Sequence, residues 1–362
     1  MRPSWVEVDL SAIAHNASVL SDEVAPSALC AVVKADADGH GDVPVAEAAL
    51  SGGAEWLAVA LVEEGARLRE AGIEAPILVL SEPMAQDVPA IVEWDLTPTA
   101  YSTGFVDALD ATGAPIAVHV KVDTGMHRVG AATPDAIEVA SRVTNAVNLR
   151  LEGLWTHLAV AEEDAEFTKR QVEMLAAVAT RLRGAGMAPE IVHAANSAGA
   201  LGYPEARLDM VRCGIALYGL DPGPGFDVDL RPAMAVKSQV SHLKHLPVGT
   251  RPSYGRVRPL PGDSTVATVP IGYADGIARR LGKTAGEVLI GGKRYPFAGT
   301  VTMDFVVVDC GDADVEVGDE VVLLGRQGDD EISADEWADR LDTINYEIVC
   351  DFGPRLPRRY LA

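Results

Sequence analysis

Several polar side chains stand directly after short apolar runs, where they are placed to do chemistry. Lys34 follows the apolar part of "AVVKADADGHG", and His157 follows that of "LRLEGLWTHL". His193 and Asn196 close "EIVHAAN", and Arg212 lies at the end of "LDMVRCG". A lysine at the end of a buried strand is desolvated, which lowers its pKa and leaves a neutral amine that can attack an aldehyde.

Another run, "VHVKVD", alternates between two kinds of side chain. The valines at 118, 120 and 122 share one face, and His119, Lys121 and Asp123 share the other. Successive strand residues point to opposite faces, so the polar set is expected in the interior of a barrel whose valines face outward. Lys121 and Asp123 could form a buried structural ion pair or serve a site, and the sequence leaves both readings open.

The order of the elements predicts how these residues are positioned. Eight apolar, strand-like runs alternate with helical segments such as 61–72 and 163–186, the second of which starts acidic and ends basic. The strand-like runs are 28–35, 56–62, 76–80, 96–100, 116–123, 149–158, 190–196 and 208–214. This pattern predicts an α/β fold with a (β/α)8 barrel over residues 1–232, with an open doubly wound sheet as the alternative. In a barrel, the polar strand ends meet on one face.

The pattern of residues along the chain changes after residue 232. Strand-like alternation with glycine and proline turns dominates, and a helical pattern returns only at 333–341. Gly291-Gly292, between "EVLI" and "KRYPF", is typical of a hairpin turn. We therefore expect a second, mostly β domain over residues 233–362.

Composition narrows the class of protein. The formal net charge is -23, which makes nucleic acid and anionic membranes poor partners. The four cysteines lie far apart without a C-x-x-C pair, so neither a metal cluster nor a redox dithiol is indicated. The N-terminus lacks the apolar segment of a signal peptide, and no run approaches the ~20 apolar residues that span a bilayer. We expect a cytoplasmic protein.

The last two strand-like runs are followed by candidate phosphate ligands. Asn196 and Ser197 begin a predicted helix in "HAANSAGAL", and Gly214 and Ile215 follow the eighth run in "RCGIALYG". Backbone N–H groups at helix starts and glycine turns bind phosphate, and these loops are the usual phosphate site of a barrel. Together with the amine of Lys34, they indicate the phosphorylated aldehyde pyridoxal 5'-phosphate (PLP).

Nine stretches in sequence order carry a resemblance to a known family. They are "AVVKADADGHG", "VHVKVDTGMHRVG", "GLWTHLA", "HAANSAGAL", "VRCGIALYG", "PSYGR", "VPIGYADG", "GTVTMDF" and "INYEIVCDFGPRLPRRY". Along essentially its whole length the chain resembles the alanine racemases. The resemblance implies a homodimeric PLP enzyme with a barrel and a β domain, which interconverts L- and D-alanine and supplies D-alanine for the bacterial cell wall.

The resemblance also implies a role for each matching residue. Lys34 would bind the PLP aldehyde and act as one base, and Tyr273 of the partner subunit would be the other. Arg212 would contact the pyridine nitrogen, His193 would support Arg212 and Tyr273, and His157 would lie against the ring. The phosphate ligands would be Asn196, Ser197, Gly214, Ile215 and Tyr346. The substrate side would be lined by Arg128 and by the partner's Met303 and Asp304, with Lys121, a position that is often carbamylated, supporting Arg128.

The chain departs from the family pattern at three positions. Asp38 stands where a tyrosine near the phosphate is usual, which predicts weaker PLP binding. His127 replaces a glycine beside Arg128, and Cys213 replaces a proline after Arg212.

Four other functions remain open as alternatives to an alanine racemase. They are a racemase of another small amino acid such as serine, a barrel-type amino acid decarboxylase, a non-enzymatic PLP-binding barrel, and a paralogue with weak or no activity.

Overall fold

The computed structural model describes residues 2–223, 225–226 and 228–362, and these form two compact units. The first comprises residues 11–37 and 41–231. The second comprises the N-terminal residues up to Leu10, residues 38–40 and residues 232–362. Each unit is described by itself.

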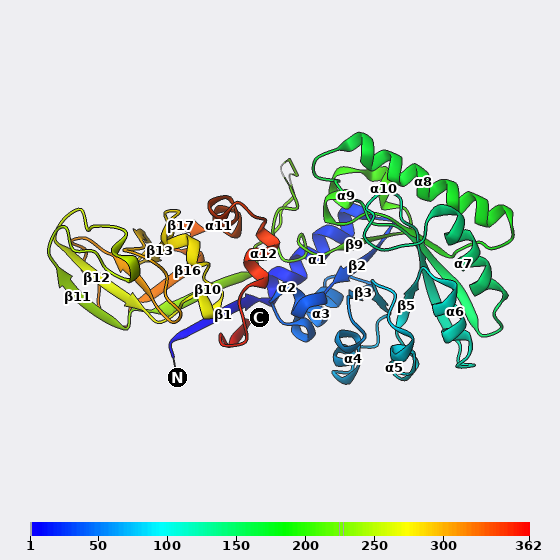
Figure 1. Cartoon of the computed structure of the whole chain (residues 1–362), viewed down its shortest axis with the longest axis horizontal. Helices are drawn as coiled ribbons and strands as arrows, with labels where there is room; N and C mark the ends of the chain where they lie inside the picture. Colours follow the sequence, from blue (N-terminus) through cyan, green and yellow to red (C-terminus); the bar gives the residue numbers. More distant parts are fainter. Residues whose placement is uncertain (1, 224, 227) are drawn as a thin grey trace. The chain divides into compact units, whose positions relative to one another are not determined.

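The first unit is a closed barrel of eight parallel strands, as predicted (Figure 1). Every strand lies within one of the eight apolar runs, because runs of β-branched and aliphatic residues suit strands that are covered on both faces. The strands are β2 (Ala28–Val32), β3 (Trp56–Val59), β4 (Ile77–Val79), β5 (Thr97–Ala100), β6 (Ile116–Lys121), β7 (Leu149–Trp155), β8 (Ile191–His193) and β9 (Met210–Cys213).

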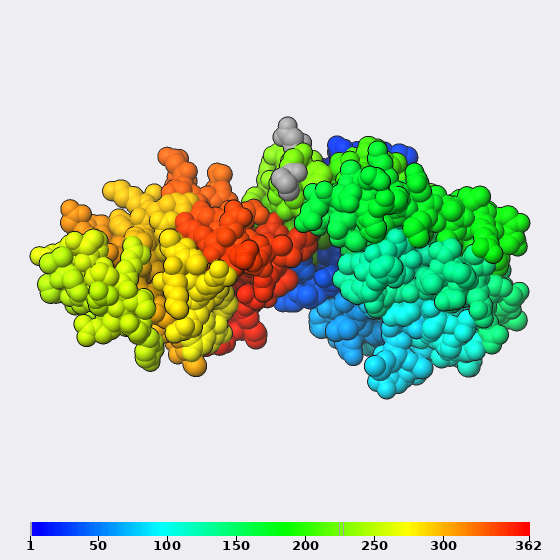
Figure 2. All heavy atoms as spheres, turned by 45° about the horizontal axis from the view of Figure 1, so that its top comes forward, coloured from blue at the N-terminus to red at the C-terminus, as the bar shows by residue number. Residues whose placement is uncertain are grey.

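Helices surround the barrel (Figure 1), and the residues of this unit run from blue through cyan to green in Figure 2. The longest, α8, begins after Asp164, whose side chain accepts a hydrogen bond from the backbone N–H of Phe167, and it ends with Arg181 and Arg183 in its last turn. This polarity suits the helix dipole. The helices are α1 (Leu10–Val24), α3 (Asp42–Ser51), α4 (Val62–Glu70), α5 (Val88–Glu93), α6 (Thr103–Asp110), α7 (Thr133–Asn145), α8 (Ala165–Gly184), α9 (Ser197–Gly202) and α10 (Pro204–Arg207).

The second unit is mostly β, as predicted, and contains two sheets. A seven-stranded sheet has the order β14-β13-β16-β10-β1-β18, with β17 paired to β16, and a three-stranded sheet has the order β11-β12-β15. Gly291 and Gly292 form the β13–β14 hairpin turn with φ of 57° and 73°, the positive values that a two-residue turn requires. The strands are β1 (Ser4–Asp9), β10 (Met234–Gln239), β11 (His242–Leu246), β12 (Ser264–Val269), β13 (Glu287–Ile290), β14 (Lys293–Pro296), β15 (Val306–Asp309), β16 (Glu320–Gln327), β17 (Asp330–Ile332) and β18 (Arg358–Leu361).

Two short helices complete the second unit, α11 (Ala334–Leu341) and α12 (Asn345–Cys350). The first lies within the helical pattern predicted for 333–341 and is capped by Ser333, whose side chain accepts from the N–H of Glu336.

The N-terminal strand corrects one expectation from the sequence. We placed residues 1–232 together in the barrel domain, but β1 pairs antiparallel with β10 and parallel with β18 in the second unit. The Ser4 and Ser238 hydroxyls also hydrogen bond at 2.8 Å. The strand therefore belongs to the second unit, because both of its partners lie beyond residue 232. Among the residues that the structure describes, no helix has the length and apolar character needed to cross a bilayer.

Candidate active site

The carboxyl ends of the barrel strands carry most of the predicted site residues. Lys34 follows β2 and is half-buried, Lys121 ends β6, and His157 follows β7. His193 ends β8, and Arg212 lies near the end of β9. Parallel strands of a barrel end on one face, so the structure brings these five side chains to the same end of the barrel.

The chain turns in an unusual way directly after Lys34. In the short helix α2 (Lys34–Asp38), Ala35, Asp36, Ala37 and Asp38 all have φ between 48° and 56°. This is a left-handed helical turn, which costs an L-residue about 1–2 kcal/mol at each position. The N–H of Ala35 donates to the Glu64 carboxylate at 2.7 Å, which helps to hold the turn. Such strain persists only where the surroundings fix it, and it is concentrated at functional sites.

Arg212 is the most constrained cation of the site, with only 3% of its surface exposed. Its Nη1 donates to His193 Nδ1 at 2.8 Å, and its Nη2 donates to the carbonyls of Thr156 and Ala194, both at 2.9 Å. A further contact reaches His157 Nδ1 at 3.3 Å. Its Nε–H has no partner among the described residues and is free for a ligand. Burial lowers the pKa of Arg212 to about 10, so the guanidinium remains charged at neutral pH.

Four basic side chains act on the pKa of His157. Burial, and then the charges of Arg212, Lys121, Arg128 and Lys34, hold the pKa of His157 well below its usual range, so its imidazole is neutral. None of these cations forms a salt bridge with a carboxylate among the described residues. A buried cation without an acidic partner is expensive, and the Arg212 guanidinium is buried, so this donor set fits a ligand that is itself anionic, such as a phosphorylated cofactor and a carboxylate substrate.

Lys121 and Asp123 do not form the ion pair that the sequence left open. The Asp123 carboxylate instead accepts from the N–H groups of Gly125 and His127 and contacts the His127 ring at 3.1 Å. The Lys121 amine lies 4.1 Å above the ring of Trp155. Burial, with the charges of Arg212 and Arg128, lowers the pKa of Lys121 to about 7.

His127 has a φ of 55°, in the left-handed region that favours glycine. A glycine would adopt this conformation easily, and the structure accommodates a histidine there. The next residue, Arg128, is exposed. Asp38 has a φ of 48° and is buried, and the expectation that it weakens PLP binding stays a prediction.

The predicted phosphate ligands of the barrel lie on two adjacent loops. Asn196 caps α9 by accepting from the N–H of Gly199 at 2.9 Å, and the Ser197 hydroxyl accepts from the N–H of Gly214 at 3.1 Å. Ile215 follows and is buried. The geometry brings these four residues together, as the sequence predicted.

In the second unit, Tyr273 lies at the start of a single helical turn, Tyr273–Asp275. The N–H of Tyr273 donates to the Thr302 carbonyl and that of Ala274 donates to the Met303 carbonyl, so Tyr273 and Met303 are neighbours. The fully buried Asp275 accepts from Gly272 and from the guanidinium of Arg2.

Arg355 links this turn to another predicted site residue. Its Nε lies 3.3 Å from Asp275, and its Nη2 donates to Asp304 at 2.6 Å. The remaining predicted ligand, Tyr346, lies in α12 and is half-buried.

Glu152 was missed at the sequence level, and His119 was placed in the barrel interior without a role. The two side chains contact each other at 3.2 Å, and His119 also contacts His193. An available signal was the glutamate-glycine pair that interrupts the apolar pattern of "LRLEGLW".

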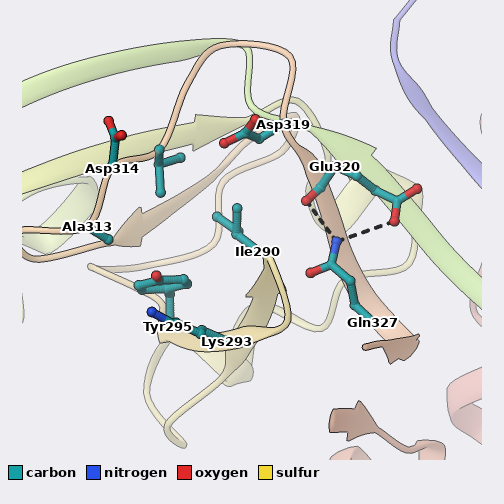
Figure 3. A pocket seen from close by; sticks show the side chains of 10 residues that line it. Ile290, Lys293, Tyr295, Ala313, Asp314, Asp319, Glu320 and Gln327 are labelled. Atoms are coloured by element: carbon teal, nitrogen blue, oxygen red, sulfur yellow. Dashed lines mark hydrogen bonds between the residues drawn. The ribbon is translucent and has the colours of Figure 1, made fainter. Parts of the chain in front are cut away.

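A hollow of about 400 Å³ in the second unit contains none of the predicted site residues (Figure 3). Its lining includes Ile290, Tyr295 and Asp319, and Gln327 donates there to the backbone and carboxylate oxygens of Glu320.

Comparisons with known proteins show the family to which the chain is similar. The family model of the alanine racemase N-terminal domain matches residues 8–222, and that of the alanine racemase C-terminal domain matches residues 233–360. The alanine racemase of Symbiobacterium thermophilum is 45% identical over 99% of this chain and 97% of its own.

Solved structures are similar over the whole chain. The alanine racemase of Bacillus anthracis with bound L-Ala-P superposes with a TM-score of 0.94 at 38% identity, over 100% of this chain and 96% of its own. The histidine racemase of Leuconostoc mesenteroides superposes with a TM-score of 0.92 at 28% identity, over 100% of this chain and 99% of its own.

Proposed function

The chain belongs to the alanine racemase family, and we propose that it interconverts L- and D-alanine with PLP, using Lys34 and Tyr273 as its two bases. The observation that carries this proposal is the buried Arg212 guanidinium, which has no carboxylate partner among the described residues and contacts the neutral His157, at the barrel end where Lys34 stands. An anionic cofactor and a carboxylate substrate complement that charge.

PLP, when bound, supplies an electron sink that acidifies the Cα–H bond of the amino acid attached to its aldehyde. The residues that would hold it are Lys34 at the aldehyde and Arg212, through its free Nε–H, at the pyridine nitrogen. The phosphate would be bound by Asn196, Ser197, Gly214 and Ile215, and by Tyr346 from the second unit.

Inversion of Cα needs a proton removed from one face and a proton returned to the other. One base on each face is the simplest arrangement, and the amine of Lys34 and the phenol of Tyr273 are the two groups proposed. A phenol has a reference pKa of about 10, so Tyr273 needs cationic or hydrogen-bonding neighbours to act as a base.

Lys34 and Tyr273 are proposed to transfer protons, whereas Arg212 must keep its proton. Although burial lowers the pKa of its guanidinium to about 10, the group keeps its protons at neutral pH. Beside a pyridine nitrogen, Arg212 would therefore donate a hydrogen bond and keep its proton, which would weaken the electron sink and suppress side reactions such as transamination.

The partner in this proposal is a second copy of the chain. Tyr273, Met303 and Phe305 are 42%, 52% and 45% exposed, an unusual state for three neighbouring large apolar side chains. In a homodimer these side chains would reach the active site of the other subunit. All four cysteines are free thiols, which favours the reducing cytoplasm as the compartment.

The test is to incubate the purified protein with PLP and L-alanine in heavy water. We expect D-alanine to form with deuterium at Cα. Competition with serine and histidine would rank other substrates, since a histidine racemase shares the fold. Binding of PLP without exchange at Cα would contradict the proposal and leave a cofactor-binding protein.

A further inference from the structure

A continuous chain of hydrogen bonds leads from Arg212 into the barrel. Arg212 Nη1 lies 2.8 Å from His193 Nδ1, His193 Nε2 lies 2.9 Å from His119 Nδ1, and His119 Nε2 lies 3.2 Å from Glu152 Oε2. Arg150 donates to the other carboxylate oxygen at 2.7 Å. We call Arg212, His193, His119 and Glu152 the relay. Each is less than 9% exposed, and both histidines are fully buried.

The chemistry of its two ends fixes the direction of every bond in the relay. A guanidinium can only donate, so His193 Nδ1 must be unprotonated and its proton lies on Nε2. That N–H donates to His119 Nδ1, which places the proton of His119 on its own Nε2. A carboxylate can only accept, so Glu152 receives this last bond. Burial, the largest cause, lowers the pKa of both histidines, in agreement with neutral rings.

An irregular pairing of β6 with β7 allows the relay to form. The register of β6 against β7 slips between Val118 and His119, so Val118 faces Leu151 while His119 faces Gly153. Glu152 is thus the extra residue of a bulge, a device that re-aims side chains beside active sites. A Cβ on Gly153 would lie only 2.2 Å from His119 Nδ1, so the ring occupies the space that glycine leaves.

We propose that His119 and Glu152 are positioning residues for the reaction: the Glu152 carboxylate holds His193 in its Nε2–H tautomer, and the Nδ1 lone pair then keeps Arg212 in one orientation. This positioning role rests on the proposed function only because it assumes that Arg212 contacts the cofactor. Without the carboxylate, His119 can carry its proton on Nδ1 instead. The proton of His193 then moves to Nδ1, where it opposes the donors of Arg212.

Three variants of the full-length protein test the proposal. Glu152→Leu removes the acceptor at similar volume, and Glu152→Gln keeps one through its amide oxygen. Glu190→Gln is the matched control, because the exposed Glu190 also pairs with Arg150, at 2.7 Å, but has no contact with the relay histidines. We expect Glu152→Leu to lower kcat about 10- to 100-fold while KM for alanine changes less than about threefold. Glu152→Gln should recover most of kcat, and Glu190→Gln should match the wild type.

The second measurement needs no activity. Long-range ¹H–¹⁵N correlation spectra of the eight histidines, with and without PLP, report which nitrogen carries each proton. The wild type should show His119 and His193 protonated on Nε2 alone, and Glu152→Leu should lose that pattern at His193. If Glu152→Leu fails to fold, Gly153→Ala, which displaces the His119 ring, should produce the same two defects.

Two results would overturn the positioning role. One is wild-type kcat in Glu152→Leu, and the other is a His193 that keeps its Nε2 proton in that variant. The spectra can be read in the cofactor-free protein, so the relay can be judged even if the wild type fails to racemise alanine. Absence of racemisation in the wild type would instead count against the proposed function.

Discussion

Lys121 shows how strongly a single buried residue can depend on pH. Burial lowers the pKa of its amine from 10.5 to about 7 in the folded chain. The unfolded chain therefore binds more protons between pH 7 and 10.5, and wild-type stability rises with pH in that window. Below pH 7 the buried ammonium opposes folding in full. A neutral amine is also the form that reacts with CO₂, in keeping with the carbamylation that the family resemblance implies.

We therefore expect Lys121→Met to stabilise the cofactor-free protein more at pH 7 than at pH 9, by about 2 kcal/mol. Urea unfolding in CO₂-free buffer at both pH values measures the difference. Lys169→Met is the control, because this lysine is exposed on α8 and its amine stays in water in both states. An equal gain from Lys121→Met at pH 7 and pH 9 would contradict the lowered pKa.

Asp275 is the residue on which the Tyr273 turn depends. It is fully buried, accepts from the backbone of Gly272 and pairs with Arg2 and Arg355. Asp275→Asn leaves two guanidinium groups without their shared carboxylate, so we expect a loss of about 3 kcal/mol in the free energy of unfolding and a fall in kcat. Asp304→Asn, which removes only the exposed partner of Arg355, should cost less than about 1 kcal/mol. Equal losses in denaturant melts of the two variants would rule out this role for Asp275.

At the scale of elements, the left-handed turn after Lys34 reverses the usual effect of glycine. Ala35 is exposed and has a φ of 54°, so Ala35→Gly removes a steric penalty that exceeds the entropy lost by glycine on folding. We expect thermal unfolding to show a gain of about 0.5–1 kcal/mol. Ala48→Gly, in the ordinary helix α3, should instead lose about 1 kcal/mol. A loss in both variants would show that the turn is not strained.

The elements that the sequence predicted are those whose signal is local. The barrel strands were found because each is an apolar run, and the β13–β14 turn because two glycines are adjacent. The left-handed turn was not found because Ala35 and Ala37 give no sign of a positive φ. The pairing of β1 with β18 joins the two ends of the chain, and the role of Glu152 depends on a bulge between β6 and β7. These features are set by tertiary contacts.

At the scale of the whole molecule, the two proposed bases belong to different units. Lys34 lies in the barrel unit with its group of cations, and Tyr273 lies in the second unit among exposed apolar side chains. The net charge of -23 is summed over the whole chain and does not describe this end of the barrel, where Arg212 is buried without a carboxylate partner among the described residues. A homodimer with shared sites requires that each site take Lys34 from one subunit and Tyr273 from the other.

Mixing two inactive variants tests this sharing. If Lys34→Ala and Tyr273→Phe subunits exchange freely, a mixed dimer has one site with both substitutions and one with neither. Random pairing makes half of the dimers mixed, so racemase activity should recover to about a quarter of the wild-type value. The double variant mixed with wild type should instead lower the activity below that of the wild type alone, because neither site of that mixed dimer is complete. If Tyr273 served its own subunit, the two single variants would remain inactive together, and the double variant would leave wild-type sites untouched.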